Sequence, residues 1–226
     1  MSKAATLAFL MAAVLPALYA QTRWAAGEGL SPRVAVFFDF ENAPSVPTFE
    51  AMKREAASAM TQAGAQLFWL KLNVDSPAET FDDLAILRFR GSCRAANPAP
   101  AGPGAALRVR LGSTEVAGHS VTSYGSVECD QLQSCLAGEL GAFCPGDREE
   151  VFGRAMGRVV AHELYHILGH STVHTHKGLS KALETPFDLV RKDFRFDREA
   201  ILRLKRRIQP EGGETRPPVQ GLSFTP

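Results

Sequence analysis

The order of predicted elements indicates an α+β domain. Apolar runs of strand length dominate the first half of the chain, whereas Val151 to Leu168 is a long apolar segment with helical periodicity. A further amphipathic stretch, Asp197 to Ile208, predicts a C-terminal helix. Strands that precede long helices, with no internal repeat apparent, are typical of the α+β class.

One helix interrupts the predicted strands of the first half. Val34 to Phe38, Gln66 to Leu72 and Leu84 to Arg90 are apolar runs that predict three strands. Thr48 to Ala63 carries apolar residues at helical spacing, follows a proline and precedes a glycine. These features predict a helix between the first two strands.

The segment before the long helix has weaker patterns. Leu107 to Leu111 alternates apolar and basic residues, which predicts a fourth strand with one wet face. Arg94 to Ala106 is rich in Ala, Pro and Gly and predicts a loop. Glu115 to Val127 contains glycines and several hydroxyl residues, so we expect irregular or edge-strand structure there.

The long helix carries signals at both ends. Asp147, with a glutamate three residues later, resembles an N-cap, and Gly169 is expected to be a left-handed C-cap after Leu168. Small residues recur at every fourth position and predict a close approach of this helix to the sheet: Gly153, Gly157 and Ala161. Arg154 and Arg158 are expected on its wetter side.

The most informative motif lies inside this helix. His162, Glu163 and His166 form an H-E-x-x-H sequence. Residues four apart share a helix face, so both imidazoles can reach one metal ion, with the glutamate beside them as a base. Chance histidines are the alternative, but five of the six histidines fall between residues 162 and 176, in or just after an apolar helix. The sequence therefore predicts a zinc site.

A catalytic zinc needs a third protein ligand and one open position. We expect this ligand from the turn after the helix, where His174 is close enough for the chain to fold back. His176 would fit a more extended turn, and His170 would fit only if the helix continued further. Glu184 and Asp188 would instead give a site with a carboxylate ligand.

The expected chemistry is hydrolysis of peptide bonds. Zinc would acidify a bound water, and Glu163 would act as the general base and pass the proton to the leaving amine. Tyr124 and Tyr165 are candidates for an oxyanion donor or a supporting hydrogen bond, with ordinary loop and core roles as the alternatives. The carboxylates considered as partners of the histidine rings are Glu128, Asp130 and Asp188. A peptide substrate is expected to add a strand along Glu115 to Val121.

This order of elements resembles the zincin metallopeptidases and is most similar to their metzincin branch. The metzincin pattern H-E-x-x-H-x-x-G-x-x-H is matched at four positions: His162, Glu163, His166 and Gly169. The final position is Thr172, and no methionine follows Met156, so the Met-turn that supports the metal in metzincins is missing. The resemblance implies a zincin-like fold, in which a mixed, twisted sheet of about four to five strands packs on the active-site helix, with a C-terminal helix.

The chain also resembles a group of uncharacterised exported bacterial proteins that share H-E-L-Y-H with a histidine about eight residues on. This resemblance spans most of residues 33 to 190. The matching segments are Ala161–Leu168 with His174, Gly178–Lys181, Phe89–Cys93 and Val127–Asp130. It implies the same fold and His174 as the third ligand, and it carries no established substrate.

Four cysteines in an exported chain predict two disulfides. They allow three pairings, of which we favour Cys93 with Cys129 and Cys135 with Cys144. A cysteine–zinc site is the alternative, although the sequence has no C-x-x-C pair to support it.

Residues 1–20 predict a signal peptide. Lys3 provides a positive start, Ala4 to Leu15 is apolar, and Ala20 is a small residue at the cleavage point. A retained membrane anchor is the competing interpretation, but the apolar run is shorter than the roughly 20 residues of a membrane span. We therefore expect a secreted or periplasmic protein without stable membrane insertion after cleavage.

The remaining chain is expected to form one domain. Residues 21–31 would be a linker, residues 32–208 the zincin-like domain, and the Pro- and Gly-rich residues 209–226 a disordered tail. Cleavage of the signal peptide leaves 24 basic and 24 acidic residues, so nothing favours a nucleic acid partner.

The sequence thus predicts an exported, monomeric, zinc-dependent metallopeptidase that acts on peptides or proteins. One alternative is a zincin fold that binds zinc for structure or recognition and cleaves little, since the Met-turn is missing. Another is a metal-free interaction domain held by disulfides.

Overall fold

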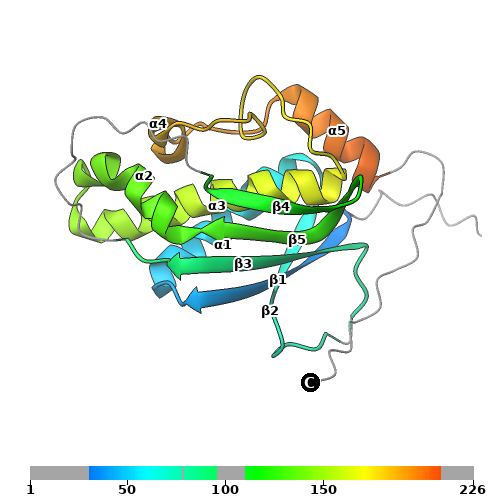
Figure 1. The fold of residues 1–226 in the computed structure, drawn as a ribbon, viewed down its shortest axis with the longest axis horizontal. Coiled ribbons are helices and arrows are strands. Elements are labelled where there is room, and N and C mark those ends of the chain that lie inside the picture. Colours follow the sequence, from blue (N-terminus) through cyan, green and yellow to red (C-terminus); the bar gives the residue numbers. More distant parts are fainter. Residues whose placement is uncertain (1–30, 78, 96–109, 210–226) are drawn as a thin grey trace, which may run out of the picture. The chain divides into compact units, whose positions relative to one another are not determined.

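A mixed β-sheet forms the centre of the part of the chain that the computed structural model describes, residues 31–77, 79–95 and 110–209. The strands are β1 (Arg33–Asn42), β2 (Gln66–Lys71), β3 (Asp83–Ser92), β4 (Gly112–Ala117) and β5 (Ser120–Glu128). Their order is β2-β1-β3-β5-β4. All neighbours pair in parallel except β4, which runs antiparallel to β5 at one edge (Figure 1).

Five helices accompany this sheet in the described residues: α1 (Val46–Gln62), α2 (Cys129–Gly141), α3 (Pro145–Gly169), α4 (Pro186–Val190) and α5 (Arg198–Ile208). In Figure 1, α1 and α3 lie behind the sheet, and α4 and α5 lie beyond the β4 edge. The predicted α+β fold, with a mixed sheet packed on the motif helix and a helix at the C-terminal end, is confirmed.

The core lies between one face of the sheet and the helices. Val34 and Val36 point to this face and pack in one apolar cluster with Met52 of α1 and Phe152 of α3. Alternate residues of a strand point to opposite faces. The intervening residues of β1 therefore contribute to a smaller cluster on the other face, formed by Ala35, Phe37, Leu72, Phe81 and Ile86.

Helix α3 packs directly on α1, which corrects two expectations. A Cβ atom at Gly157 would lie 2.5 Å from the carbonyl oxygen of Met52, so this glycine allows the close approach of α3 to α1, where the prediction had a close approach to the sheet. Arg158 is fully buried and was wrongly expected on the wet side. Its guanidinium donates 2.8 Å to Glu55 of α1 and 2.9 Å to the carbonyl of Asp188.

Both ends of α3 extend beyond the predicted limits. Cys144 is the N-cap, and the proline that follows takes the first helical position, so Asp147 lies within the first turn instead of capping it. At the other end Gly169 is still helical, and His170 adopts the left-handed conformation with φ 46°. The prediction of Gly169 as the left-handed residue was therefore wrong by one position.

The segment between β3 and α3 differs most from the prediction. Of the predicted strand 107–111 only Arg110 and Leu111 are described, and neither is in a strand, because β4 begins at Gly112. Residues 115–127 form a hairpin around Gly118 and are more regular than expected, with β4 as the edge. Helix α2 was not predicted.

Residues 1–30 and 210–226 lie outside the described residues, so the predicted signal peptide and tail remain predictions. None of the described helices is long and apolar enough to cross a membrane.

Candidate metal centre

Helix α3 places the three motif residues near its C-terminal end. The helix is buried over most of its length, from Val151 to Leu168, which fixes its rotation against the core. His162 and His166 then project on one side, and their Nε2 atoms lie 3.0 Å apart. Glu163 is 4 % exposed beside them.

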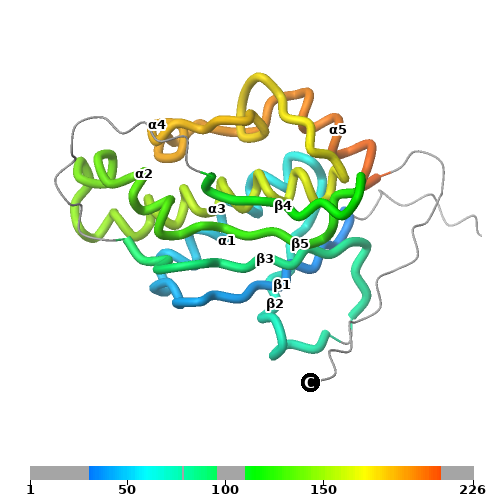
Figure 2. Tube along the Cα trace, in the orientation of Figure 1, coloured from blue at the N-terminus to red at the C-terminus, as the bar shows by residue number. Residues whose placement is uncertain are grey.

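His174 joins this pair because the chain reverses after α3 and returns past the end of the helix (Figure 2). The Tyr165 hydroxyl donates 3.1 Å to the carbonyl of Val173 and so fixes the backbone next to His174. On the other side, Thr175 is buried and bonded to Ser180 through both backbone and hydroxyl. The Nε2 atom of His174 consequently lies 3.2 Å from that of His166.

Backbone carbonyls orient the two helical histidines. Nδ1 of His162 lies 2.6 Å from the carbonyl oxygen of Leu179, and Nδ1 of His166 lies 2.6 Å from that of Ser171. Each Nδ1–H can donate to its carbonyl, which fixes the tautomer that leaves Nε2 with a free lone pair. Both rings thus turn their metal-binding nitrogen toward the same point.

The protonation of the histidines also suits a metal. Burial lowers the pKa of His162 to about 3, and the neighbouring His166 acts in the same direction. Burial likewise lowers the pKa of His166 and of His174. A ligating imidazole must be neutral, so these shifts favour the binding form.

The three histidines fit zinc. Their ligand atoms all lie within 4.8 Å of one another. Two nitrogens on a tetrahedral zinc, each about 2.05 Å from the ion, would be about 3.3 Å apart. The separations of His166 Nε2 from the Nε2 atoms of His162 and His174, 3.0 and 3.2 Å, are close to this value. Three neutral imidazoles are a known zinc donor set that leaves a fourth position for water.

Glu163 is held by the edge strand β4. Thr114 donates a 2.6 Å hydrogen bond to its Oε2. Gly112, on the same face of β4, leaves the space that the carboxylate occupies, because a Cβ atom there would lie 2.5 Å from Oε1. Burial raises the pKa of Glu163 to about 7, against the opposing effects of the Thr114 bond and of Arg110.

Glu184 lies beside Nδ1 of His162, the ring nitrogen opposite the one that would bind a metal. Its side chain is 8 % exposed, and its Oε1 is 3.8 Å from Nδ1 of His162. Burial raises the pKa of Glu184 to about 8, with Lys181 opposing the shift. Because it faces Nδ1 and not Nε2, Glu184 is placed to support the site and not to provide the third ligand.

Three further candidates for the third ligand lie outside the cluster of ligand atoms. His176 is exposed, and His170 forms the left-handed turn at the end of α3. Asp188 accepts bonds from Lys181 and from Thr185, with which it forms the capping box of α4.

The carboxylates and tyrosines expected to support the site have contacts of their own. Glu128 and Asp130 bond to Ser126 and Ser92, respectively. Tyr124 is 43 % exposed on β5. Tyr165 is a core residue, and its hydroxyl supports the turn that carries His174.

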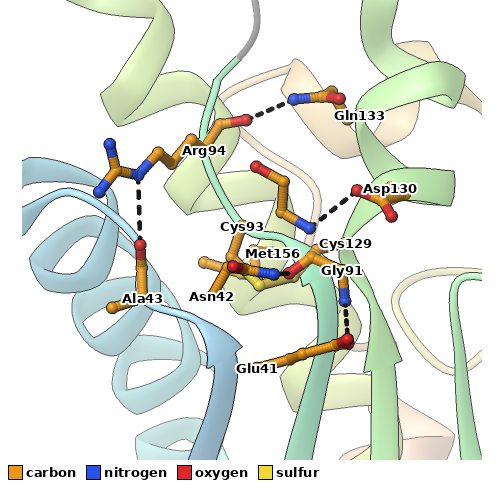
Figure 3. Close-up of a disulfide and its surroundings, with 11 residues drawn as sticks. Glu41, Asn42, Ala43, Gly91, Cys93, Arg94, Cys129, Asp130, Gln133 and Met156 are labelled. Atoms are coloured by element: carbon orange, nitrogen blue, oxygen red, sulfur yellow. Dashed lines mark hydrogen bonds between the residues drawn. A yellow bond between two sulfur atoms is a disulfide. The ribbon is translucent and has the colours of Figure 1, made fainter.

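One of the two predicted disulfides is present. Cys93 and Cys129 join the end of β3 to the start of α2, beside Met156 (Figure 3). The pairing of Cys135 with Cys144 was wrong, since both are free thiols. Cys135 lies within α2, whereas Cys144 caps the separate helix α3.

Sequence reasoning missed the supporting residues. Thr114 and Gly112 belong to no motif, and their role depends on how β4 lies against α3. The carbonyls of Leu179 and Ser171 carry no side-chain signal. Glu184 is the exception. It was considered from the sequence, although as a third ligand and not as a supporting residue.

Comparisons with known proteins add little. No protein-family model matches the sequence, and no curated protein does. A crystal structure of archaemetzincin from Methanopyrus kandleri matches over 81% of this chain and 98% of that chain, with 12% identity and a TM-score of 0.45. A likeness this weak carries no argument about activity, and no comparison supports the resemblance to exported bacterial proteins.

Proposed function

We propose that this protein is an exported zinc-dependent metallopeptidase that acts as a monomer on peptides or proteins. The observation that carries the proposal is the convergence of three Nε2 atoms, from His162, His166 and His174, beside the buried carboxylate of Glu163. Export rests on the predicted signal peptide.

The chain's own residues supply the remaining parts of a hydrolase. Zinc, when bound, would polarise the scissile carbonyl and acidify the attacking water. Glu163 would take the proton of that water and deliver it to the leaving amine. Burial of Glu163 raises its pKa above that of a free glutamate, which makes the carboxylate a stronger base toward the water.

The edge strand β4 suits an extended substrate. Its outer side has no strand partner among the described residues, and Thr114 connects it to Glu163. We propose that a peptide pairs with β4, which would hold the scissile bond beside the base. Residues 115–117 of the expected edge belong to this strand.

The test combines metal content with hydrolysis. We expect about one zinc per chain in the purified protein, a sharp loss of zinc in His174→Ala, and cleavage of a quenched fluorescent casein that a chelator stops. Glu163→Gln should keep its zinc and lose roughly 10²- to 10⁴-fold in cleavage rate. Glu150→Gln, an exposed glutamate of the same helix, is the matched control.

Two outcomes would replace the proposal. Stoichiometric zinc without cleavage in the native chain would favour a zinc-binding zincin fold that cleaves little. Absence of zinc after exposure to the metal would leave a disulfide-bonded interaction domain.

A further inference from the structure

Glu184 is a buried carboxyl group with an unpartnered oxygen. Its side chain is 8 % exposed, and its Oε1 has no hydrogen bond among the described residues. The ionised form of a carboxyl group in this condition is unfavourable unless a positive charge lies nearby.

The two nearest cations, Lys181 and Arg158, favour the ionised form of Glu184 through their charge, but their hydrogen bonds go to other groups. Lys181 donates 2.5 Å to Asp188. Arg158 bonds through Nε and Nη1 to Glu55 and to the carbonyls of Asp188 and Leu189, whereas its Nη2 has no hydrogen bond among the described residues. Within the described part of the chain, no lysine or arginine forms an ion pair with Glu184.

Glu184 instead faces the ring of a metal-binding histidine. Its Oε1 lies 3.8 Å from Nδ1 of His162, whose hydrogen is directed at the carbonyl of Leu179. The opposite ring nitrogen, Nε2, lies 3.0 Å from Nε2 of His166, which in turn lies 3.2 Å from Nε2 of His174. The imidazole therefore lies between the carboxyl group and the place of the ion.

We propose that Glu184 is a positioning residue for the metal, whose carboxylate balances the charge of a divalent ion through the ring of His162. The inference rests on the proposed metal site. Three neutral histidines bring no negative charge to a dication, so a nearby carboxylate stabilises the loaded site. Partners of ligand rings typically change metal affinity 10- to 100-fold.

The experiment measures zinc affinity directly, by competition with a chromophoric chelator. Glu184→Gln keeps the size of the side chain and removes its charge, and we expect zinc to bind about 10- to 100-fold more weakly. Glu184→Asp, which keeps the charge, should recover most of the affinity. Glu150→Gln, at an exposed glutamate of α3 outside the site, should bind as the native chain does.

A second measurement separates this role from a structural one. Because Oε1 of Glu184 has no hydrogen bond to lose, Glu184→Gln should not lower the melting temperature in the presence of chelator, and it should reduce the rise produced by zinc. If the amide prevents folding, Glu184→Met repeats the test without charge.

The outcomes distinguish the inference from the function. Equal zinc affinity in the native chain and in Glu184→Gln overturns the inference alone. Loss of melting temperature with chelator and unchanged zinc affinity assigns Glu184 to folding and also overturns it. A native chain that binds no zinc overturns the proposed function and the inference together.

Discussion

At the scale of single side chains, the position and the pKa of Glu163 depend on two residues of β4. Thr114 donates to its Oε2, and Gly112 leaves room for its Oε1. Burial favours the protonated acid, whereas the Thr114 bond favours the carboxylate that a general base needs. The balance between these two effects holds the pKa near neutrality.

Thr114→Val should disturb this balance without removing a metal ligand. Loss of a hydrogen bond to a charged group corresponds to about 1.5–3 kcal/mol, so we expect cleavage at neutral pH to fall about 10- to 100-fold. The pKa of Glu163 should rise further, which shifts the acid limb of the pH–rate profile to higher pH. Zinc content should stay the same, and Thr114→Ser should restore activity. An unchanged pH–rate profile in Thr114→Val would mean that Thr114 has no effect on the base Glu163.

The candidate metal ligands and the base could be predicted from the sequence, whereas the residues that hold them in place could not. His162, Glu163 and His166 form a local motif, and His174 follows from the distance that a reversing chain can span. Thr114 comes from a strand almost fifty residues earlier. Its bond is a consequence of tertiary packing, to which local patterns are blind.

At the scale of elements, two glycines of α3 allow this helix to approach α1 closely. Gly153 faces the carbonyl of Thr48, and Gly157 faces that of Met52. This contact sets the position of α3 and therefore of both helical histidines. A methyl group at either position would push the two helices apart.

Gly157→Ala should therefore destabilise the protein. Alanine is favoured over glycine in a helix by about 1 kcal/mol, but overpacking costs about 1–3 kcal/mol, so we expect a net loss near 1 kcal/mol in urea unfolding. Gly138→Ala in α2 is the matched control, since a Cβ atom there has no neighbour within 4 Å. It should gain up to about 1 kcal/mol. Equal gains in both variants would contradict the close packing.

The elements with strong periodicity were predicted, and those with competing signals were not. Continuous apolar runs identified β1, β2 and β3, which are parallel strands covered by helices. Helix α2 has Leu132, Leu136 and Leu140 at helical spacing, all buried. This spacing was a usable helix signal, but the predictions for this segment concerned single residues, among them its cysteines, and not its secondary structure.

At the scale of the whole molecule, the burial of charged groups is the property that the sequence did not reveal. The formal charge is only +1, and composition gave no hint that Arg158 is enclosed or that two carboxyl groups lie beside three neutral histidines. Burial depends on tertiary structure, so these shifts in pKa could not be predicted from the chain. They make the stability of the protein dependent on pH.

The buried groups act in opposite directions once a chelator removes metal. The pKa of His162 is lowered, so its contribution to stability is lost as pH falls from about 6.5 toward 3. Glu163 and Glu184 have raised pKa values of about 7 and about 8, so their contributions are lost as pH rises from about 4.5 through those values. Above about pH 7 the carboxyl groups dominate, because free histidine is already neutral.

We therefore expect the chelated protein to lose on the order of 1 kcal/mol of unfolding free energy between about pH 7 and 8.5. Most of this loss belongs to Glu184, whose pKa lies within the range. Glu184→Gln should be nearly flat over the same interval and more stable than the native chain at its upper end. Urea titrations of both proteins in chelator at several pH values measure the difference. Parallel curves would mean that Glu184 is already ionised in the folded chain at neutral pH.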